Sequence, residues 1–384
     1  MTTQQTLQTL SYADPYPRQK PQLLIDISGI IRYDSRTGIP RVVKSQLHAL
    51  TRLDQDICSV EPIYLDTYDN TPPLHFYAST RRPLSLKKGD ILYTPDLDPQ
   101  SVKEATCHRL YRCYKNLGVS LVTLIHDILP ITHPEFFVKG QDAIHKEWLS
   151  SVLAFSDMLI TTSDATKDAL SAYAPHHPPI YTVAPGVSLP PVHAPSIPSV
   201  QTEHPSFLVV STLEPRKAHA QLLDAFEILW AKGYPFPLTF VGKQGWHVES
   251  LIERIRTHPQ NGKLLCYKAF VADEELNALY TNADALIVAS YAEGFGLPLI
   301  EAAHRGLSLV VRDIPVFREV ASTHAYYFPD TRAARPLADA ILAWSRLYAN
   351  DAHPKTARMP YNDQTQNARL LLERFAPFFL FNKM

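Results

Sequence analysis

Two glutamates, Glu293 and Glu301, stand eight positions apart in residues 293–301, which read Glu-Gly-Phe-Gly-Leu-Pro-Leu-Ile-Glu. The apolar run at 285–290 just before them predicts a buried parallel strand. Pro298 suits the first turn of a following helix, where its missing N–H leaves no hydrogen bond unmade. The backbone amides that open such a helix lie at the carboxyl edge of the sheet, where phosphate binds well. A diphosphate on these amides, with hydroxyls on the two carboxylates, describes a nucleotide-sugar.

A basic pair, Arg216 and Lys217, lies between a predicted strand at 207–211 and a predicted helix at 218–232. An Arg fork and a Lys ammonium stabilise the negative charge that a nucleoside diphosphate gains as it leaves. The helix dipole disfavours cations at a helix start, so an anion should compensate them, and a bound phosphate would do so. The alternative is a solvated basic pair.

Three further residues lie where strands of the N-terminal half end. His126 and Asp127 follow a predicted strand at 120–125, and Gly38 precedes a predicted helix at 40–53. His126 is either an active-site group or a core histidine bonded to loop backbone. Asp127 orients His126, contacts an acceptor or caps a loop. Gly38 is either a phosphate or acceptor contact or a plain turn glycine.

Residues 293–301 resemble the E-x7-E element of the family 4 retaining glycosyltransferases, also called group 1 glycosyl transferases. Residues 213–217 (Leu-Glu-Pro-Arg-Lys), 241–246, 125–127 and 36–41 resemble other elements of that family in the expected order. The resemblance covers residues 22 to about 350. The chain departs from the family where Ser211 and Thr212 replace a frequent Arg, and where Gly38 stands without the usual neighbouring glycines.

The resemblance implies the GT-B fold, with two Rossmann-like domains facing across a cleft. It also implies roles for particular residues. His126 and Glu293 would be catalytic, and Glu301 would bind the ribose hydroxyls of the donor. Gly38 and Asp127 would belong to the acceptor or phosphate loop. The remaining donor-binding residues would be Arg216, Lys217, Gly294, Phe295, Gly296 and Leu297.

The alternation of strands and helices independently predicts an α/β protein with two doubly wound domains in its 384 residues. We expect a polar tail at 1–20, an N-terminal acceptor domain at 21–187 and a Pro-rich linker at 188–206. A C-terminal donor domain at 207–350 and a segment at 351–384 that returns to the N-terminal domain would follow. The segment 375–381 is rich in phenylalanine; we expect it to dock on that domain rather than to meet a membrane.

Charge and composition exclude several classes of protein. A formal net charge of −1 argues against a nucleic-acid binder. The four cysteines show no metal spacing and indicate reduced cytosolic thiols. Asp96 and Asp98 match a D-x-D metal-binding motif. A chain of this length is expected to contain about one such match by chance, so we interpret both as loop residues. No signal peptide or membrane-spanning run is expected. These features predict a cytoplasmic protein, with peripheral contact at the inner face of a membrane as an added possibility.

The sequence thus predicts a retaining, metal-independent glycosyltransferase without a cofactor. We expect mannose from GDP-mannose as the first choice of donor and UDP-sugars as the second. The acceptor would be a glycan or lipid-linked glycan in surface polysaccharide or lipopolysaccharide biosynthesis. The alternatives are a nucleotide-sugar 2-epimerase or a phosphorylase on the same fold, or a nucleotide-sugar-binding protein without catalysis.

Overall fold

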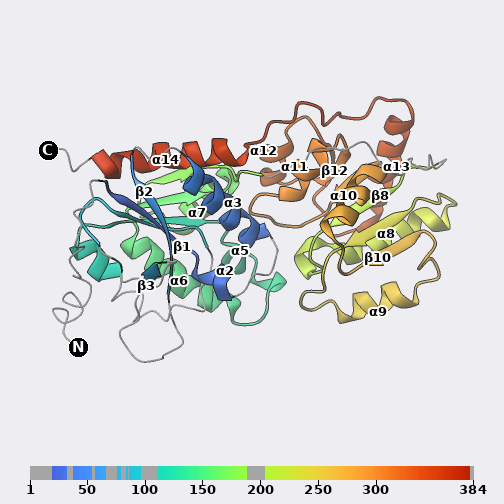
Figure 1. The fold of residues 1–384 in the computed structure, drawn as a ribbon. Helices are drawn as coiled ribbons and strands as arrows, with labels where there is room; N and C mark the ends of the chain where they lie inside the picture. Colours follow the sequence, from blue (N-terminus) through green and yellow to red (C-terminus); the bar gives the residue numbers. More distant parts are fainter. Residues whose placement is uncertain are drawn as a thin grey trace. The chain divides into compact units, whose positions relative to one another are not determined.

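The chain divides into two compact units in the computed structural model (Figure 1). Residues 20–32, 38–53, 57–65, 76–78, 84, 86–96, 111–187 and 204–380 are described. Unit 1 comprises Met1–Ile131, Gly140–Ser188 and Tyr361–Met384, and unit 2 comprises Thr132–Lys139 and Leu189–Pro360. Residues 1–19 of the expected polar tail and residues 188–203 of the expected linker fall outside the described residues.

Two segments fall on the other side of the boundaries that we drew from the sequence. Residues 132–139, expected in the N-terminal domain, group with unit 2. Residues 351–360, expected in the returning segment, also group with unit 2. Contacts with distant parts of the chain decide both cases.

Unit 1 is built on a seven-stranded sheet in its described part, with the strand order β3-β2-β1-β4-β5-β6-β7. Only β3 in this sheet runs antiparallel to its neighbour. Its strands are β1 (Gln22–Asp26), β2 (Ser59–Leu65), β3 (Phe76–Ala78), β4 (Ile91–Thr94), β5 (Ser120–Ile125), β6 (Met158–Thr161) and β7 (Ile180–Thr182). Its helices include α2 (Ser28–Arg32), α3 (Gly38–Arg52), α5 (Leu129–Thr132), α6 (Gln141–Phe155), α7 (Asp164–Tyr173) and α14 (Gln364–Leu380). The fully buried apolar runs of β5 and β6 are typical of a parallel sheet covered on both faces.

Helix α14 belongs to unit 1 although it comes last in the chain. It lies along α3, as Figure 1 shows for the red helix beside the blue one. Phe375 is fully buried, and its ring centroid lies 5.1 Å from that of Tyr93 on β4. Asn367 donates from Nδ2 to the carbonyl of Ala184 at 2.7 Å. Phe379 is buried as well, so the phenylalanine-rich segment docks on unit 1 at Phe375 and Phe379. In the described part of the chain, every helix is too short or too polar to traverse a bilayer.

Unit 2 contains a six-stranded parallel sheet in its described part, with the order β10-β9-β8-β11-β12-β13. Its strands are β8 (Phe207–Val210), β9 (Leu238–Val241), β10 (Leu265–Lys268), β11 (Ala285–Val288), β12 (Ser308–Arg312) and β13 (Tyr326–Phe328). Its helices are α8 (His219–Ala231), α9 (Glu249–Thr257), α10 (Asp273–Asn282), α11 (Leu297–His304), α12 (Pro315–Ala321) and α13 (Ala334–Ala349), with 3-10 turns η1 (Pro134–Phe136) and η2 (Pro215–Lys217). Because β8 and β11 are neighbours, the loops that follow them meet at one edge of the sheet.

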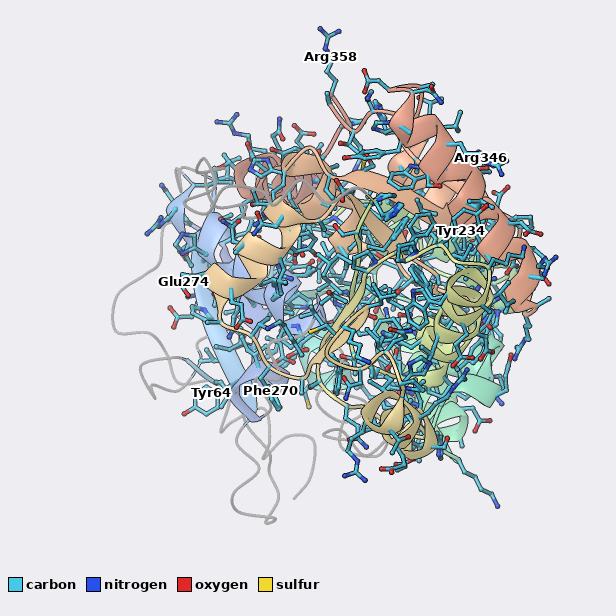
Figure 2. The ribbon with its side chains drawn as sticks, turned by 90° about the vertical axis from the view of Figure 1, so that its right-hand side faces the viewer. Tyr64, Tyr234, Phe270, Glu274, Arg346 and Arg358 are labelled. Atoms are coloured by element: carbon cyan, nitrogen blue, oxygen red, sulfur yellow. The ribbon has the colours of Figure 1, made fainter. Side chains whose placement is uncertain are left out.

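The strands predicted at 120–125, 207–211 and 285–290 agree with β5, β8 and β11 to within two residues. Sequence reasoning missed α12 and β13 in unit 2, and it missed β2, β3, α2, α5 and α6 in unit 1. The core of unit 2 is aromatic. Phe207 packs against the rings of Phe226, Phe236 and Trp344 at centroid distances of 5.3–5.7 Å. At the rim of that core Tyr234, labelled in Figure 2, stacks on Phe236. This core fixes β8 and α8 on either side of the basic pair.

Gly242 directly follows β9 and packs against Ser211, in the loop that leads to the basic pair. The structure leaves no room for a side chain at this glycine. Its φ is +146°, and a Cβ would lie 2.0 Å from the carbonyl oxygen of Ser211. We expect Gly242→Ala to destabilise unit 2 by roughly 2–4 kcal/mol, because backbone must move to admit the methyl group. Gly262→Ala is the control: its φ is also positive, at +73°, but nothing lies within 4 Å of the added Cβ. Urea unfolding of both variants measures the difference, and equal losses would contradict this account.

Candidate active site

The loops after β8 and β11 are joined by a backbone hydrogen bond. The amide of Tyr291 donates to the carbonyl of Arg216 at 2.9 Å. The Arg216 guanidinium in turn donates from Nη1 to the carbonyl of Ala292 at 2.8 Å. The basic pair and the glutamate loop, far apart in sequence, therefore form one structure.

Four charged side chains gather at this junction. Arg216 donates from Nη1 to Glu293 at 2.7 Å and from Nη2 to Glu214 at 2.6 Å. Lys217 forms an ion pair with the other carboxylate oxygen of Glu293, which also accepts from Ser290 Oγ at 3.0 Å. All four charged side chains are at most 15% exposed. The basic pair is therefore paired and mostly buried, unlike the solvated alternative.

The anions that balance Arg216 and Lys217 in this structure are carboxylates. We expected a phosphate to compensate two cations at a helix start; Glu214 and Glu293 provide two negative charges there instead. Hydrogen bonds between a charged arginine and two carboxylates are strong in a partly buried setting. The two negative and two positive charges of the cluster balance, so a diphosphate that bound there would have to compete with Glu293 for the same two cations.

The ionisation of Glu293 follows from these neighbours. Burial acts to raise the pKa of its carboxyl, but the charges of Arg216 and Lys217 and their hydrogen bonds outweigh burial and lower the pKa to about 2. Glu293 is therefore an anion at neutral pH.

A glycine turn precedes α11, in the order of strand, turn and helix that the sequence predicted. Gly296 is the N-cap with φ +105°, a left-handed conformation, and a Cβ there would lie 3.1 Å from the Phe317 ring. Leu297 opens the helix, and Pro298 lies in its first turn. This fully described helix has no acidic residue in that turn, so its own side chains leave the positive end of its dipole uncompensated. Gly294 is buried and Phe295 is half-buried in the same turn.

Glu301 lies one turn into α11 and is only 4% exposed. Its Oε2 accepts a hydrogen bond from the Tyr280 hydroxyl of α10 at 2.9 Å. Most helix glutamates are exposed to solvent, whereas Glu301 is buried and hydrogen-bonded.

The other predicted site residues belong to unit 1. His126 is 6% exposed, and its Nε2 lies 2.8 Å from the carbonyl oxygen of Pro95. Burial lowers the pKa of His126, although the Pro95 bond and nearby Asp127 act the other way, so a neutral ring donates from Nε2. Asp127 Oδ1 accepts from the amide of Leu129 at 3.0 Å, which caps α5. Gly38 is exposed and is the first residue of α3.

Several residues to which sequence reasoning gave no role in the site help to shape it. Phe136 stacks on Tyr291 with ring centroids 5.6 Å apart, and Trp246 Nε1 donates to the Phe136 carbonyl at 2.8 Å. Arg312 is fully buried, lies 4.2 Å above the Tyr291 ring, and donates from Nε to Ala289 at 2.9 Å. These contacts hold Tyr291, the residue whose amide binds Arg216. Aromatic residues in loops gave no sequence signal for this role.

A metal site is not found within the described residues, where no three His, Cys, Asp or Glu side chains come together suitably. Asp96 lies in the described part of the D-x-D match, and Asp98 lies outside it.

The free cysteines Cys58 and Cys113 are buried, and burial raises the pKa of Cys58 to about 11.

Comparison with known families decides the identity of unit 2. Residues 195–363 match the sequence model of "Glycosyl transferases group 1". The C-terminal domain belongs to the group 1 glycosyl transferases. The matched range contains the Arg216–Lys217 pair and the whole segment 293–301, so the cluster described above is a feature of a group 1 glycosyl transferase domain.

Relatives extend the similarity to most of the chain. A serotype-specific mannosyltransferase, WbdA, of Escherichia coli is 35% identical over 93% of this chain and 47% of the relative. The O-antigen chain mannosyltransferase B of the same organism is 28% identical over 56% of each chain. The chain thus spans about half the length of these curated relatives.

Solved structures establish the fold. HepE of Anabaena, in complex with UDP and glucose, superposes with a TM-score of 0.64 at 16% identity, over 93% of this chain and 99% of HepE. The catalytic domain of starch synthase IV from Arabidopsis thaliana gives a TM-score of 0.67 at 12% identity, over 94% and 99% of the two chains. The predicted GT-B fold is confirmed.

Proposed function

We propose that the chain is a retaining glycosyltransferase that moves mannose from GDP-mannose to a glycan or lipid-linked acceptor in surface polysaccharide biosynthesis. The observation that carries the proposal is the buried pairing of Arg216 and Lys217 with Glu293, beside the open N-terminus of α11. Two cations and a helix dipole suit a diphosphate, and the similarity to mannosyltransferases supports the sugar.

In the proposed complex, the donor diphosphate binds Arg216, Lys217 and the amides of the 294–297 turn. The ribose hydroxyls bind Glu301. Glu293 then exchanges its cation partners for the hydroxyls of the transferred sugar. The result is a pre-organised set of charges aimed at the bond that breaks.

The reaction exchanges one bond at the anomeric carbon for another. The bond from C1 to the diphosphate oxygen breaks, and a bond from C1 to the acceptor oxygen forms on the same face. The acceptor proton passes to the leaving phosphate oxygen, so no protein base is required. Arg216 and Lys217 stabilise the growing charge on that phosphate, and no metal is needed.

Unit 1 supplies the acceptor side of this proposal. The family resemblance assigns His126 to the reacting sugar, and Gly38 and Asp127 to the acceptor or phosphate loop. The neutral His126 ring, fixed through Nε2 by Pro95, suits hydrogen bonding rather than charge donation. The reaction would take place in the cytoplasm or at the inner face of a membrane.

A ligand screen followed by a transfer assay tests the function. GDP-mannose at about 100 times its Kd should stabilise the protein by about 2.7 kcal/mol in thermal unfolding, whereas UDP-glucose should not. Transfer to an acceptor glycan should continue in EDTA, and NMR should find an α-linked mannose. A β-linkage would exclude the retaining reaction. Loss of activity in EDTA with recovery in Mn²⁺ would exclude metal independence, and a response to UDP-glucose alone would exclude GDP-mannose.

A further inference from the structure

A buried tyrosine holds the carboxylate of Glu301. The Tyr280 side chain is 1% exposed and that of Glu301 is 4% exposed, and the hydroxyl donates to Oε2 at 2.9 Å. Figure 2 shows that α10 presents Glu274, in its first turn, to the surface. Tyr280, two turns later, faces the interior instead. A phenylalanine at position 280 would fill the core equally well, but the hydroxyl of Tyr280 is directed at the Glu301 carboxylate.

One guanidinium secures both members of this pair. Arg305 lies with its Cζ 4.9 Å from the centroid of the Tyr280 ring. Its Nη1 donates to the backbone carbonyl of Glu301 at 2.7 Å, and its Nε donates to Asn277 Oδ1 at 2.8 Å. Asn277 and Tyr280 belong to α10, and Glu301 belongs to α11. Arg305 therefore ties the two helices together at the level of the carboxylate.

The orientation of a glutamate carboxylate needs such a support. The last torsion of a glutamate side chain has a broad, weak preference, so the chain itself does not set the plane of the two oxygens. Accepting bonds from two neighbouring ribose hydroxyls requires one plane. A tyrosine ring has few torsions, and its hydroxyl bound to Oε2 reduces the freedom of the carboxylate before any ligand arrives.

We propose that Tyr280 is a positioning residue for the donor: it orients the Glu301 carboxylate toward the ribose hydroxyls. This inference rests on the proposed function of the site. Tyr280 acts through Glu301 and does not touch the nucleotide. Its effect therefore appears in donor binding, through the ribose, rather than in the bond-breaking step.

Nucleotides with and without ribose hydroxyls test this role. We expect Tyr280→Phe to raise the Kd for GDP about tenfold in isothermal titration, because the carboxylate loses a hydrogen bond that keeps it oriented. The Kd for 2′,3′-dideoxy-GDP, which has no hydroxyls for Glu301, should stay within about twofold of wild type. In the transfer assay the donor KM should rise while kcat changes little.

The chain offers a matched control. Tyr348 Oη donates to the Asp284 carboxylate at 2.6 Å in the same unit, from α13. Tyr348→Phe removes an equivalent tyrosine–carboxylate bond away from Glu301, so its Kd for both nucleotides should match wild type. In a Glu301→Ala background, Tyr280→Phe should have no further effect on GDP binding.

Each contrary outcome has a distinct meaning. Wild-type GDP affinity in Tyr280→Phe would overturn the inference, and so would an equal weakening for GDP and its dideoxy analogue. If Tyr280→Phe does not fold, Arg305→Met should weaken GDP more than dideoxy-GDP, and an equal effect would overturn the inference. A wild-type protein that binds neither nucleotide would instead overturn the proposed donor.

Discussion

Replacing Glu293 by glutamine is expected to lower kcat by about 10²–10³-fold and at the same time to tighten the binding of GDP. The carboxylate now pairs with both Arg216 and Lys217. A neutral amide of the same size releases these cations for the phosphates of the nucleotide. The same amide replaces the anion that the proposed mechanism sets against the reacting sugar, so the chemical step suffers.

Steady-state kinetics and GDP titration separate these two effects. Glu275→Gln is the control, because Glu275 pairs with a lysine, Lys268, at 2.8 Å on an exposed part of the same unit. It should match wild type in both measurements. If Glu293→Gln binds GDP more weakly than wild type, Glu293 organises the cations for the nucleotide and does not compete with it.

Replacing Lys217 by alanine is expected to reduce kcat/KM for the donor about 10³-fold. The Lys217 side chain is 15% exposed, and in the proposed reaction its ammonium is the point charge beside the leaving phosphate. Arg216 cannot fully replace it, since its guanidinium already binds Glu214, Glu293 and a backbone carbonyl. Loss of one of its two cationic partners should also raise the pKa of Glu293 from about 2.

Transfer kinetics at saturating acceptor measure this loss. Lys232→Ala removes an exposed lysine whose nearest acid, Asp339, is 3.9 Å away, and it should leave kcat/KM unchanged. Unfolding curves for both variants should show whether each is folded under assay conditions. A Lys217→Ala enzyme within threefold of wild type would remove this lysine from the proposed chemistry.

The fold could be predicted largely from local patterns. The apolar run at 285–290, the glycine turn and Pro298 each favour one local structure, and together they place β11 and α11 correctly. The short antiparallel β3 and the 3-10 turn at 215–217 have no comparable pattern. The segment 132–139 joins unit 2 through Phe136 and Trp246, a contact between residues far apart in sequence.

Sequence reasoning selected three charged residues that the structure brings together, but it did not predict how they pair. Arg216 and Lys217 were selected from the sequence because a leaving diphosphate needs cations, and Glu293 was selected as one of the two carboxylates of the segment 293–301. That Glu293 occupies both cations depends on the adjacency of β8 and β11. Tyr280 reads as an ordinary apolar position on a helix. Only the packing of α10 against α11 shows that its hydroxyl meets Glu301.

The late position of α14 in the chain bears on how the protein is made. The ribosome releases α3, which ends at Arg52, long before α14, which begins at Gln364 and covers it. The 311 residues between Arg52 and Gln364 correspond to roughly 15–60 s of synthesis. During that time the surface of α3 and β4 that α14 later contacts lacks this helix, while unit 2 is translated and can fold. Unit 1 is thus begun first and completed last, and a nascent chain stalled within this interval would expose the apolar surface around Tyr93 to chaperones.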